Sequence, residues 1–234
     1  MNNCSICNTV NPDFALRCIS CGGILQQNVK ALDLFSTIYN LWRYPDFTFR
    51  KIILAEHRNH TILMGVLEAV GLSFLSFFIL KAGDIYSIDL VQLFSAGIGL
   101  AIVVYLPFLY LYSILSYMAG RVSRTGASLK GFIAGMIYAL HPIGLGAIII
   151  LPSEAAVFGS YVFSNNPSPQ TINPAPFYLF GFLECLMGTA AIFLVFRLTR
   201  LFFGNGKKTA IFAGIFFILL FTAMEITKQT LTKR

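Results

Sequence analysis

Apolar runs of about twenty residues alternate with short polar segments along most of the chain. Five such runs cover residues 62–80, 90–119, 131–151, 177–196 and 209–224. An α-helix needs ~20 residues to cross ~30 Å of hydrocarbon, and each run is near that length. Strands buried in soluble sheets span only about 4–8 residues, so these runs are too long for strands. The pattern therefore predicts an all-α membrane protein built on a five-helix transmembrane bundle.

The overall composition agrees with that pattern. Of the 234 residues, 56% are hydrophobic and only 12% are charged, and the mean hydropathy is +0.73. Soluble domains carry about 25% charged residues, about twice the share found in this chain. These values exclude a soluble enzyme, a disordered tail and a collagen-like fibre.

The basic residues predict an orientation in the membrane. The net charge is +7, from 17 basic and 10 acidic residues. With the N-terminus in the cytosol, the inner segments carry Arg17, Lys30, Arg43, Arg50, Lys51, Arg58, Arg121, Arg124, Lys130, Arg197, Arg200, Lys207 and Lys208. The two outer loops carry only Lys81, against Asp84, Asp89 and Glu154. The positive-inside rule then places the N-terminus in the cytosol and the C-terminus outside.

The fifth run fits this scheme least well. It is the shortest, and it reaches a full span only if its helix continues to Ile226 or Thr227. The tail beyond it places Lys228, Lys233 and Arg234 on the outer side, against the rule. A partly re-entrant fifth segment is therefore an alternative to a full crossing.

Two amphipathic helices are predicted between the first cysteines and the first span. Leu32, Phe35, either Ile38 or Tyr39, and Trp42 recur at helical spacing, and a break follows at Tyr44-Pro45. A second helix then carries Phe49, Ile52 and Ile53 beside the basic residues Arg50, Lys51 and Arg58. Apolar aromatics next to arginines are typical of helices that lie in the membrane interface. A soluble cytosolic linker is the alternative.

Four cysteines near the N-terminus form a metal-binding pattern. Cys4 and Cys7 make one Cys-x-x-Cys pair, and Cys18 and Cys21 make a second after ten intervening residues. No signal peptide precedes them, so we expect the reducing cytosol, where such pairs bind metal more often than they form disulfides. Two pairs supply four thiolates in the tetrahedral arrangement that suits Zn²⁺. A four-thiolate iron site and a redox dithiol are the competing readings.

The predicted zinc ribbon has a structural role. Four sulfur ligands leave no open position for water or substrate, and about twenty residues need the metal to fold at all. The ribbon is therefore a docking or capping module. Nucleic acid is not an expected partner, because Arg17 is the only basic residue between Met1 and Val29.

Three ionisable residues inside the apolar runs are candidate functional groups. Counted from the cytoplasmic ends at ~1.5 Å per residue, Glu68 lies roughly 9 Å deep, His141 roughly 15 Å and Glu184 roughly 18 Å. Charged groups are expensive in hydrocarbon, so these residues indicate either a proton or cation path or a polar contact between helices. A hydrogen bond between His141 and Glu184 would lower the cost of burying both.

Prolines and glycines predict irregularities in the spans. Pro107 and the pair His141-Pro142 should kink their helices or free a carbonyl. Gly131-x-x-x-Gly135 lets two helices approach closely. Residues 152–176, rich in Pro, Ser and Asn, are predicted to form a long outer loop, with 155–163 on the outer surface of the bundle.

The entry to the first span resembles a known family. The segment Arg43-Tyr44-Pro45-Asp46-Phe47-Thr48-Phe49-Arg50-Lys51-Ile52 is similar to the entry segment of prokaryotic Yip-domain proteins, which are related to the Ypt/Rab-interacting proteins. Tyr138-Ala139-Leu140-His141-Pro142 resembles a Tyr…Pro element of that family, and five spans after a cytosolic N-terminus match it. The resemblance implies a non-enzymatic protein of the prokaryotic plasma (inner) membrane, and it carries over no catalytic residue.

These observations predict four segments and leave two functions open. The segments are a zinc ribbon at 1–28, interfacial linker helices at 29–60, a five-span domain at 61–228 and a tail at 229–234. The chain has no HExxH, GxSxG, Walker A or GxGxxG signature, so an enzyme is not predicted. One hypothesis is a non-catalytic scaffold or accessory subunit that binds the bilayer and a protein partner or a second copy of itself. The other is a small proton- or ion-coupled transporter that uses Glu68, His141 and Glu184.

Overall fold

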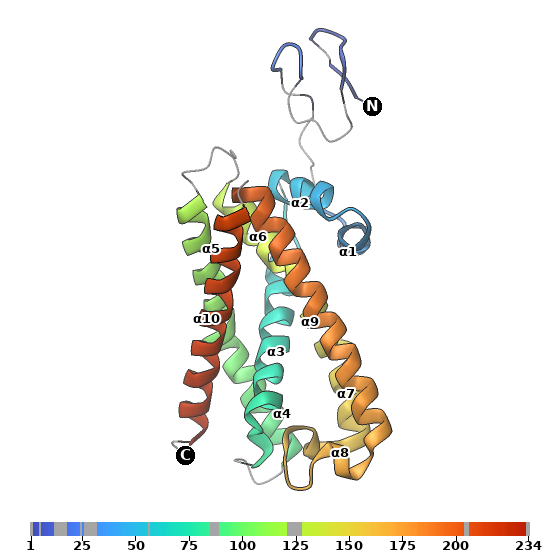
Figure 1. Ribbon diagram of the computed structural model, residues 1–234, viewed down its shortest axis with the longest axis vertical. Coiled ribbons are helices and arrows are strands. Elements are labelled where there is room, and N and C mark those ends of the chain that lie inside the picture. The colour runs from blue at the N-terminus through green and yellow to red at the C-terminus, as the bar shows by residue number, and fades with distance from the viewer. Residues whose placement is uncertain are drawn as a thin grey trace.

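A computed structural model shows a helical bundle with a small head at its N-terminal end (Figure 1). The structure describes residues 2–4, 6–11, 18–23, 25, 32–55, 57–84, 89–120, 128–203 and 206–232. The basic residues Arg17, Lys30, Arg121 and Arg124, and the predicted boundary at residue 28, lie outside these ranges. In the head, β1 (Asn2–Asn3) and β2 (Val10–Asn11) pair antiparallel, with Asn2 opposite Asn11.

Four candidate membrane spans are present in the described part of the chain. They cover Thr61–Leu80, Leu90–Met118, Leu129–Phe163 and Pro174–Phe203. The elements within them are α3 (Thr61–Leu80), α4 (Leu90–Leu100), the π-helix η2 (Ala101–Tyr105), α5 (Leu106–Gly120), α6 (Leu129–Ala139), α7 (His141–Phe158), the 3₁₀ helix η3 (Gly159–Phe163) and α9 (Pro174–Phe203). These helices indicate an integral membrane protein.

The fifth apolar run forms α10 (Gly206–Thr232), a helix of 27 residues. It lies alongside α5 and runs the length of the bundle in Figure 1. The hydroxyl of Tyr105 bonds to Ser76 of α3 and lies 3.1 Å from the hydroxyl of Thr227 on α10. Tyr112 of α5 donates a hydrogen bond to the carbonyl of Phe212, also on α10, at 2.8 Å. These buried contacts join α10 to the bundle.

The two predicted linker helices are present. They are α1 (Leu34–Arg43), which Asp33 caps by accepting a hydrogen bond from the Ser36 N–H, and α2 (Pro45–Leu54), with the proline at its first turn. Proline at that position lacks an N–H where the helix does not need one, so the predicted break at Tyr44 is confirmed. Leu41 of α1 is buried, whereas Phe35, at 81% exposure, faces outward.

Both predicted irregularities around proline are confirmed. The Leu106 N–H bonds to the carbonyl of Ala101, five residues back, so one π-turn precedes Pro107. This wider turn shifts the backbone hydrogen bonds at the point where the proline ring would otherwise clash with the carbonyl of the preceding turn. The third span is interrupted at Leu140, between α6 and α7, immediately before His141 and Pro142.

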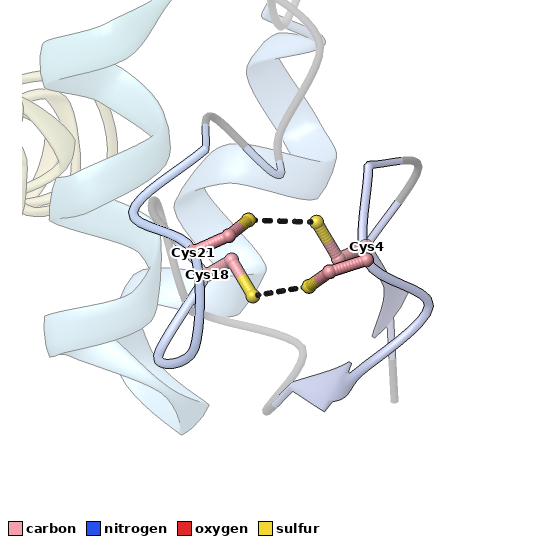
Figure 2. Close-up of side chains that lie close together, drawn as sticks. Cys4, Cys18 and Cys21 are labelled. Atoms are coloured by element: carbon pink, nitrogen blue, oxygen red, sulfur yellow. Dashed lines mark hydrogen bonds between the residues drawn. The ribbon is translucent and has the colours of Figure 1, made fainter.

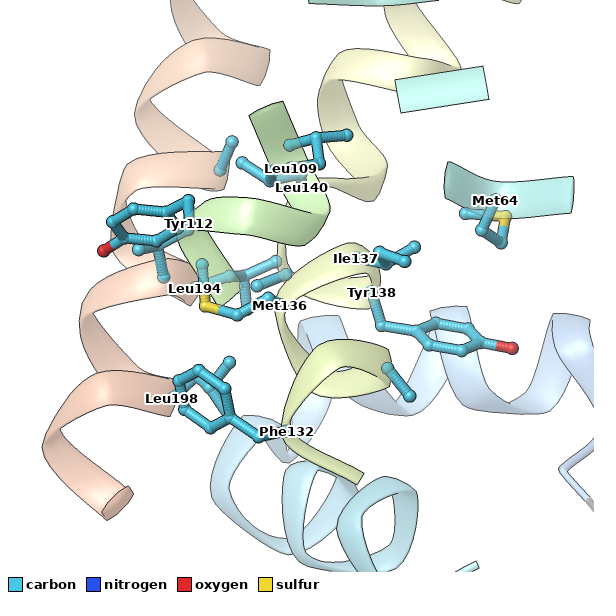
Figure 3. Packing of buried hydrophobic residues seen from close by; sticks show 14 of the residues in the cluster. Met64, Leu109, Tyr112, Phe132, Met136, Ile137, Tyr138, Leu140, Leu194 and Leu198 are labelled. Carbon is cyan, nitrogen blue, oxygen red and sulfur yellow. The ribbon is translucent and has the colours of Figure 1, made fainter. Parts of the chain in front are cut away.

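The larger apolar core surrounds α6. Figure 3 shows Phe132 and Met136 of α6 beside Leu194 and Leu198 of α9, and all four side chains are buried. Gly131 lies so close to the Ile53 carbonyl of α2 that a Cβ atom at this position would overlap it. The small residues of the Gly131-x-x-x-Gly135 motif thus pack α6 against α2 and α9.

The predicted outer loop at 152–176 is wrong. The helix α7 continues through Pro152 to Phe158, η3 follows it, and α8 (Pro169–Ile172) precedes α9. Phe158 and Phe163 are buried in a second apolar cluster, and so do not lie on the outer surface. Phe163 packs against Phe74 and Phe77 of α3, and Phe158 lies edge-on to Phe180 of α9. The burial of these rings outweighs the missing hydrogen bond at Pro152, an effect that the local sequence pattern does not reveal.

Candidate metal centre and membrane-embedded polar groups

Four sulfur atoms meet in the N-terminal head. The Sγ atoms of Cys4 and Cys21 lie 3.6 Å apart, and those of Cys7 and Cys18 lie 3.4 Å apart. Figure 2 shows the side chains of Cys4, Cys18 and Cys21 pointing toward one another. All four lie within 4.8 Å of one another. A tetrahedral ion with sulfur ligands at about 2.3 Å would place the sulfurs about 3.8 Å apart. These distances fit a four-coordinate metal site and are too long for a disulfide, whose sulfurs are about 2.05 Å apart.

The two cysteine pairs are held by the same set of backbone hydrogen bonds. In the first pair, the Ile6 N–H donates to Cys4 Sγ at 3.4 Å, and the Asn8 N–H donates to the Cys4 carbonyl at 2.9 Å. The second pair repeats this arrangement around Cys18. Each pair therefore forms a closed turn that directs its sulfurs inward.

In the second turn, the Ser20 N–H donates to Cys18 Sγ at 3.4 Å and the Gly22 N–H donates to the Cys18 carbonyl at 3.0 Å. Gly22 and Asn8 occupy equivalent positions, and both have positive φ, at 69° and 54°. Asparagine adopts this left-handed backbone more readily than most residues. Asn8 is thus a supporting residue that the sequence analysis missed, although its position four residues after Cys4 matches that of Gly22 after Cys18.

Asn11 is a second supporting residue that the sequence analysis missed. Its side chain is buried; Oδ1 accepts a hydrogen bond from the Ile19 N–H at 2.9 Å, and Nδ2 donates to Cys18 Sγ at 3.6 Å. It therefore joins β2 to the second turn and donates to a sulfur. Donors of this kind orient and stabilise thiolate ligands.

The thiols of the cluster differ in acidity. Hydrogen bonds with Thr9, whose hydroxyl lies 3.2 Å from Cys7 Sγ, lower the pKa of Cys7 to about 6. Although the Gly23 backbone acts to lower the pKa of Cys21, the neighbouring Cys7 and Cys4 side chains raise it to about 12. In a cluster of four close sulfurs without a bound cation, one thiol, here Cys7, ionises easily, and its charge disfavours ionisation of a neighbour, here Cys21. A bound metal cation would displace the remaining protons.

Glu68 lies at the interruption of the third span. It is fully buried, and its Oε2 accepts a hydrogen bond from the Gly144 N–H in the first turn of α7 at 2.9 Å. The N–H groups of a first turn have no partner inside their own helix, and a carboxylate at that end is favourable. Glu68 is therefore an N-terminal cap for a helix that begins within the bundle.

His141 does not meet Glu184, so the predicted pair is wrong. Its Nδ1 donates to the Tyr138 carbonyl at 2.8 Å, and the Trp42 ring lies edge-on to it with centroids 5.5 Å apart. The interruption at Leu140 turns His141 back onto the last turn of α6, where it satisfies a freed carbonyl. Depth counted along the sequence cannot reveal this turn.

Glu184 instead shares its surroundings with Glu154. Both side chains line two adjoining cavities between α3, α7 and α9. Glu154 was predicted to lie in the outer loop, but it is only 5% exposed because α7 continues past Pro152. The sequence signal that could have located it is its spacing of four from Ile150 and Phe158, both of which are buried.

Charged groups at the other end of the bundle hold the short helices in place. Arg197 of α9 forms a 2.7 Å ion pair with Asp46 of α2. Arg58 donates to the Ile53 carbonyl at 2.7 Å and to the Ile52 carbonyl at 3.2 Å, which caps the end of α2. These contacts attach α2 to the bundle at the end where the head lies in Figure 1.

Comparison with known proteins returns no relative. No protein-family model, no curated protein and no solved structure matches the chain.

Proposed function

We propose that this protein is a non-catalytic membrane adaptor, or an accessory subunit of a membrane complex, whose cytosolic zinc ribbon is a docking module. The observation that carries the proposal is the closed set of four cysteine sulfurs, all within 4.8 Å, at the N-terminal end of an apolar helical bundle. Such a set can bind an ion but leaves no position for a substrate. We further propose that the ion is Zn²⁺, the usual occupant of a Cys₄ site of this spacing.

The polar groups inside the bundle favour the adaptor over a transporter. Glu68 caps α7, His141 bonds to the last turn of α6, and Glu184 lies in a separate cleft with Glu154. A proton- or ion-coupled transporter that uses Glu68, His141 and Glu184 would need these groups to face one continuous path. No hydrogen bond among the described residues joins these three groups, which supports structural roles for Glu68 and His141.

The proposed orientation places the head in the cytosol and the C-terminus outside, in a prokaryotic plasma membrane. Basic residues at the head-end termini of the helices include Arg43, Arg50, Lys51, Arg58, Lys130, Arg197 and Arg200. At the opposite end, Lys81 and Lys228 lie with Asp84 and Asp89. The positive-inside rule supports this direction. In this proposal α10 crosses the membrane as a fifth span, which the buried Tyr105–Thr227 contact supports.

The exposed aromatic face of α1 supports a position in the membrane interface. Phe35, Tyr39 and Trp42 are 81%, 61% and 50% exposed, while Leu41 on the other face is fully buried. Rings next to Arg43 at the cytoplasmic end are typical of interfacial anchors. The resemblance of the α2 segment to Yip-domain proteins is consistent with an adaptor, and membership of that family remains part of the proposal.

The proposal is tested by metal-dependent association. A tagged chain is extracted from its native membrane in mild detergent, and the stoichiometry of co-purifying protein is measured for the wild type, for the double variant Cys4→Ser/Cys7→Ser and for Cys185→Ser. Cys185 lies on α9, far from the head in the sequence, so its variant controls for loss of a thiol. We expect a stoichiometric partner with the wild type and with Cys185→Ser.

The double variant should lose that partner while it stays inserted and monodisperse. Recovery of the wild-type protein alone, correctly inserted, contradicts the adaptor. Equal recovery of the partner with the double variant contradicts the assignment of docking to the head.

A further inference from the structure

The helices α3 and α9 both pack on α7 but make few contacts with each other. In Figure 1, α9 leans away from α3 toward the end of the bundle opposite the head. Two adjoining cavities of about 70 and 330 Å³ fill the resulting cleft, and both are lined by Leu75, Phe78, Glu154 and Glu184. The protein therefore has a partly open cleft at membrane depth with α7 as its floor.

The walls of this cleft are apolar except for two carboxyl groups. Aromatic rings come from Phe74, Phe78, Phe163 and Phe177. Glu154 is 5% exposed, and among the described residues neither it nor Glu184 has a hydrogen bond or a basic nitrogen within 4.0 Å. Glu184 is partly buried. A buried carboxyl group without a partner, such as Glu154, is costly in hydrocarbon and marks a functional site more often than a structural one.

One basic group lies near the mouth of the cleft. Lys81 follows the last turn of α3, and its Nζ lies 4.1 Å from the centroid of the Phe78 ring. Burial lowers the pKa of Lys81, while the charges of Asp84, Glu184 and Glu154 act to raise it. Asp84 is already engaged, because it accepts hydrogen bonds from Ser164 and from the Asn165 N–H.

Lys81 offers one positive charge to the two carboxyl groups, and both can ionise in this apolar cleft only if a second positive charge joins them. In the described part of the lining, no second basic side chain supplies that charge. A bound monocation would restore neutrality.

The lining also indicates which kind of cation fits. A divalent metal ion takes about six oxygen ligands, and the remaining cleft residues are hydrocarbon, thioether, thiol or glycine. An organic ammonium needs fewer direct ligands, and aromatic rings attract it through their faces. Its hydrocarbon part would contact the apolar walls, as in most small-molecule sites.

We propose that the cleft between α3, α7 and α9 binds a lipophilic organic monocation, an ammonium with an apolar body, through Glu154 and Glu184. The ammonium head lies between the two carboxylates and the rings of Phe74 and Phe78, and the apolar body lies toward the lipid side. This site is independent of the metal-binding head. A membrane lipid with an ammonium head and a soluble amphiphilic amine share this chemistry.

The test uses benzyltrimethylammonium as the probe and the full chain in nanodiscs of phosphatidylglycerol. Binding is measured by equilibrium dialysis against protein-free nanodiscs, with neopentylbenzene as a neutral probe of the same shape. We expect saturable binding of the cation only, and a loss of at least about tenfold in affinity for Glu154→Gln and for Glu184→Gln. Glu225→Gln, on α10 outside the cleft, should bind as the wild type does.

A second variant separates loss of binding from loss of fold. A Cβ at Gly188 meets nothing within 4 Å, so Gly188→Leu fills the cleft without removing a charge. This variant should abolish binding while keeping the helical circular dichroism of the wild type. Equal uptake of the neutral probe, or unchanged affinity in both glutamine variants, would overturn the proposal.

Changing the lipid of the nanodiscs distinguishes the two possible sources of the natural cation. In nanodiscs that contain phosphatidylethanolamine, competition with the probe identifies the lipid head as the occupant. Unchanged probe affinity there identifies a soluble amine. Either result supports the site, because both require the carboxylate-dependent binding described above.

Discussion

The contact between Glu68 and Gly144 gives a sharp test of how the third span is held. A Cβ at Gly144 would lie 2.9 Å from Oε1 and 3.0 Å from Oε2 of Glu68. Gly144→Ala therefore pushes the carboxyl group away from the N–H that it caps. The clash comes from a single side chain, so Glu68→Ala removes it.

The expected magnitude is the sum of two effects. Overpacking a tight contact costs about 1–3 kcal/mol, and a buried N–H that loses its partner costs about 1–3 kcal/mol. We expect Gly144→Ala to lower the free energy of unfolding by about 2–6 kcal/mol in the wild type. In the Glu68→Ala background the same change should cost less than about 0.5 kcal/mol, because the N–H is already unpaired and the space is free.

The assay is equilibrium unfolding in mixed micelles of a mild detergent and dodecyl sulfate, followed by circular dichroism. Gly99→Ala is the matched control: Gly99 also lies within a span, in α4, and a Cβ there meets nothing within 4 Å. Since alanine favours a helix by roughly 0.5–1 kcal/mol over glycine, the control should be neutral or stabilising.

Additive costs for Glu68→Ala and Gly144→Ala, within about 0.5 kcal/mol, would refute the reasoning. A Gly144→Ala variant as stable as Gly99→Ala would refute it as well. In either case Glu68 would not be the cap of α7.

Three further outcomes are expected. Purified protein should contain one zinc ion per chain by elemental analysis, and acid or a strong chelator should release it. The variant Cys4→Ser should lower the zinc content, whereas Cys185→Ser should not. The fluorescence of Trp42, the only tryptophan, should be quenched more by lipids brominated near the headgroup than by lipids brominated near the chain end, and the reverse order would contradict an interfacial α1. Gly131→Ala should destabilise the fold by about 1–3 kcal/mol more than Gly135→Ala in the micelle assay, because the first meets a backbone carbonyl and the second a leucine side chain that can move.

Local patterns were sufficient for the secondary structure of most elements. The spans at 62–80 and 90–119, the break before Pro45 and the interruption at His141-Pro142 all follow from run length and from proline, which act within a few residues. The cysteine spacing likewise predicted the four-sulfur cluster, because each Cys-x-x-Cys turn closes on its own backbone. The repeated turn also makes Asn8 the counterpart of Gly22, a relation that is visible in the sequence only once the turn is known.

The failed predictions concern residues whose surroundings come from distant parts of the chain. The segment at 152–176 resembles a loop by composition, yet the Phe163 ring packs against rings on α3, more than eighty residues earlier, and the Phe158 ring packs against Phe180 on α9. His141 and Glu184 were paired by depth, and depth does not say which way a helix faces after an interruption.

The sequence by itself determined that most of this chain is helical and that four cysteines near its start can hold a metal. It predicted five runs near membrane length, and four candidate spans are present in the described part of the chain. The length of an apolar run and the spacing of cysteines depend only on residues within one segment, so both features can be predicted from each segment separately. Only the tertiary structure decided that Glu68 caps α7 and that Glu154 joins Glu184 in a cleft. Those roles depend on the rotation of each helix against its neighbours, and the packing of the whole bundle sets that rotation.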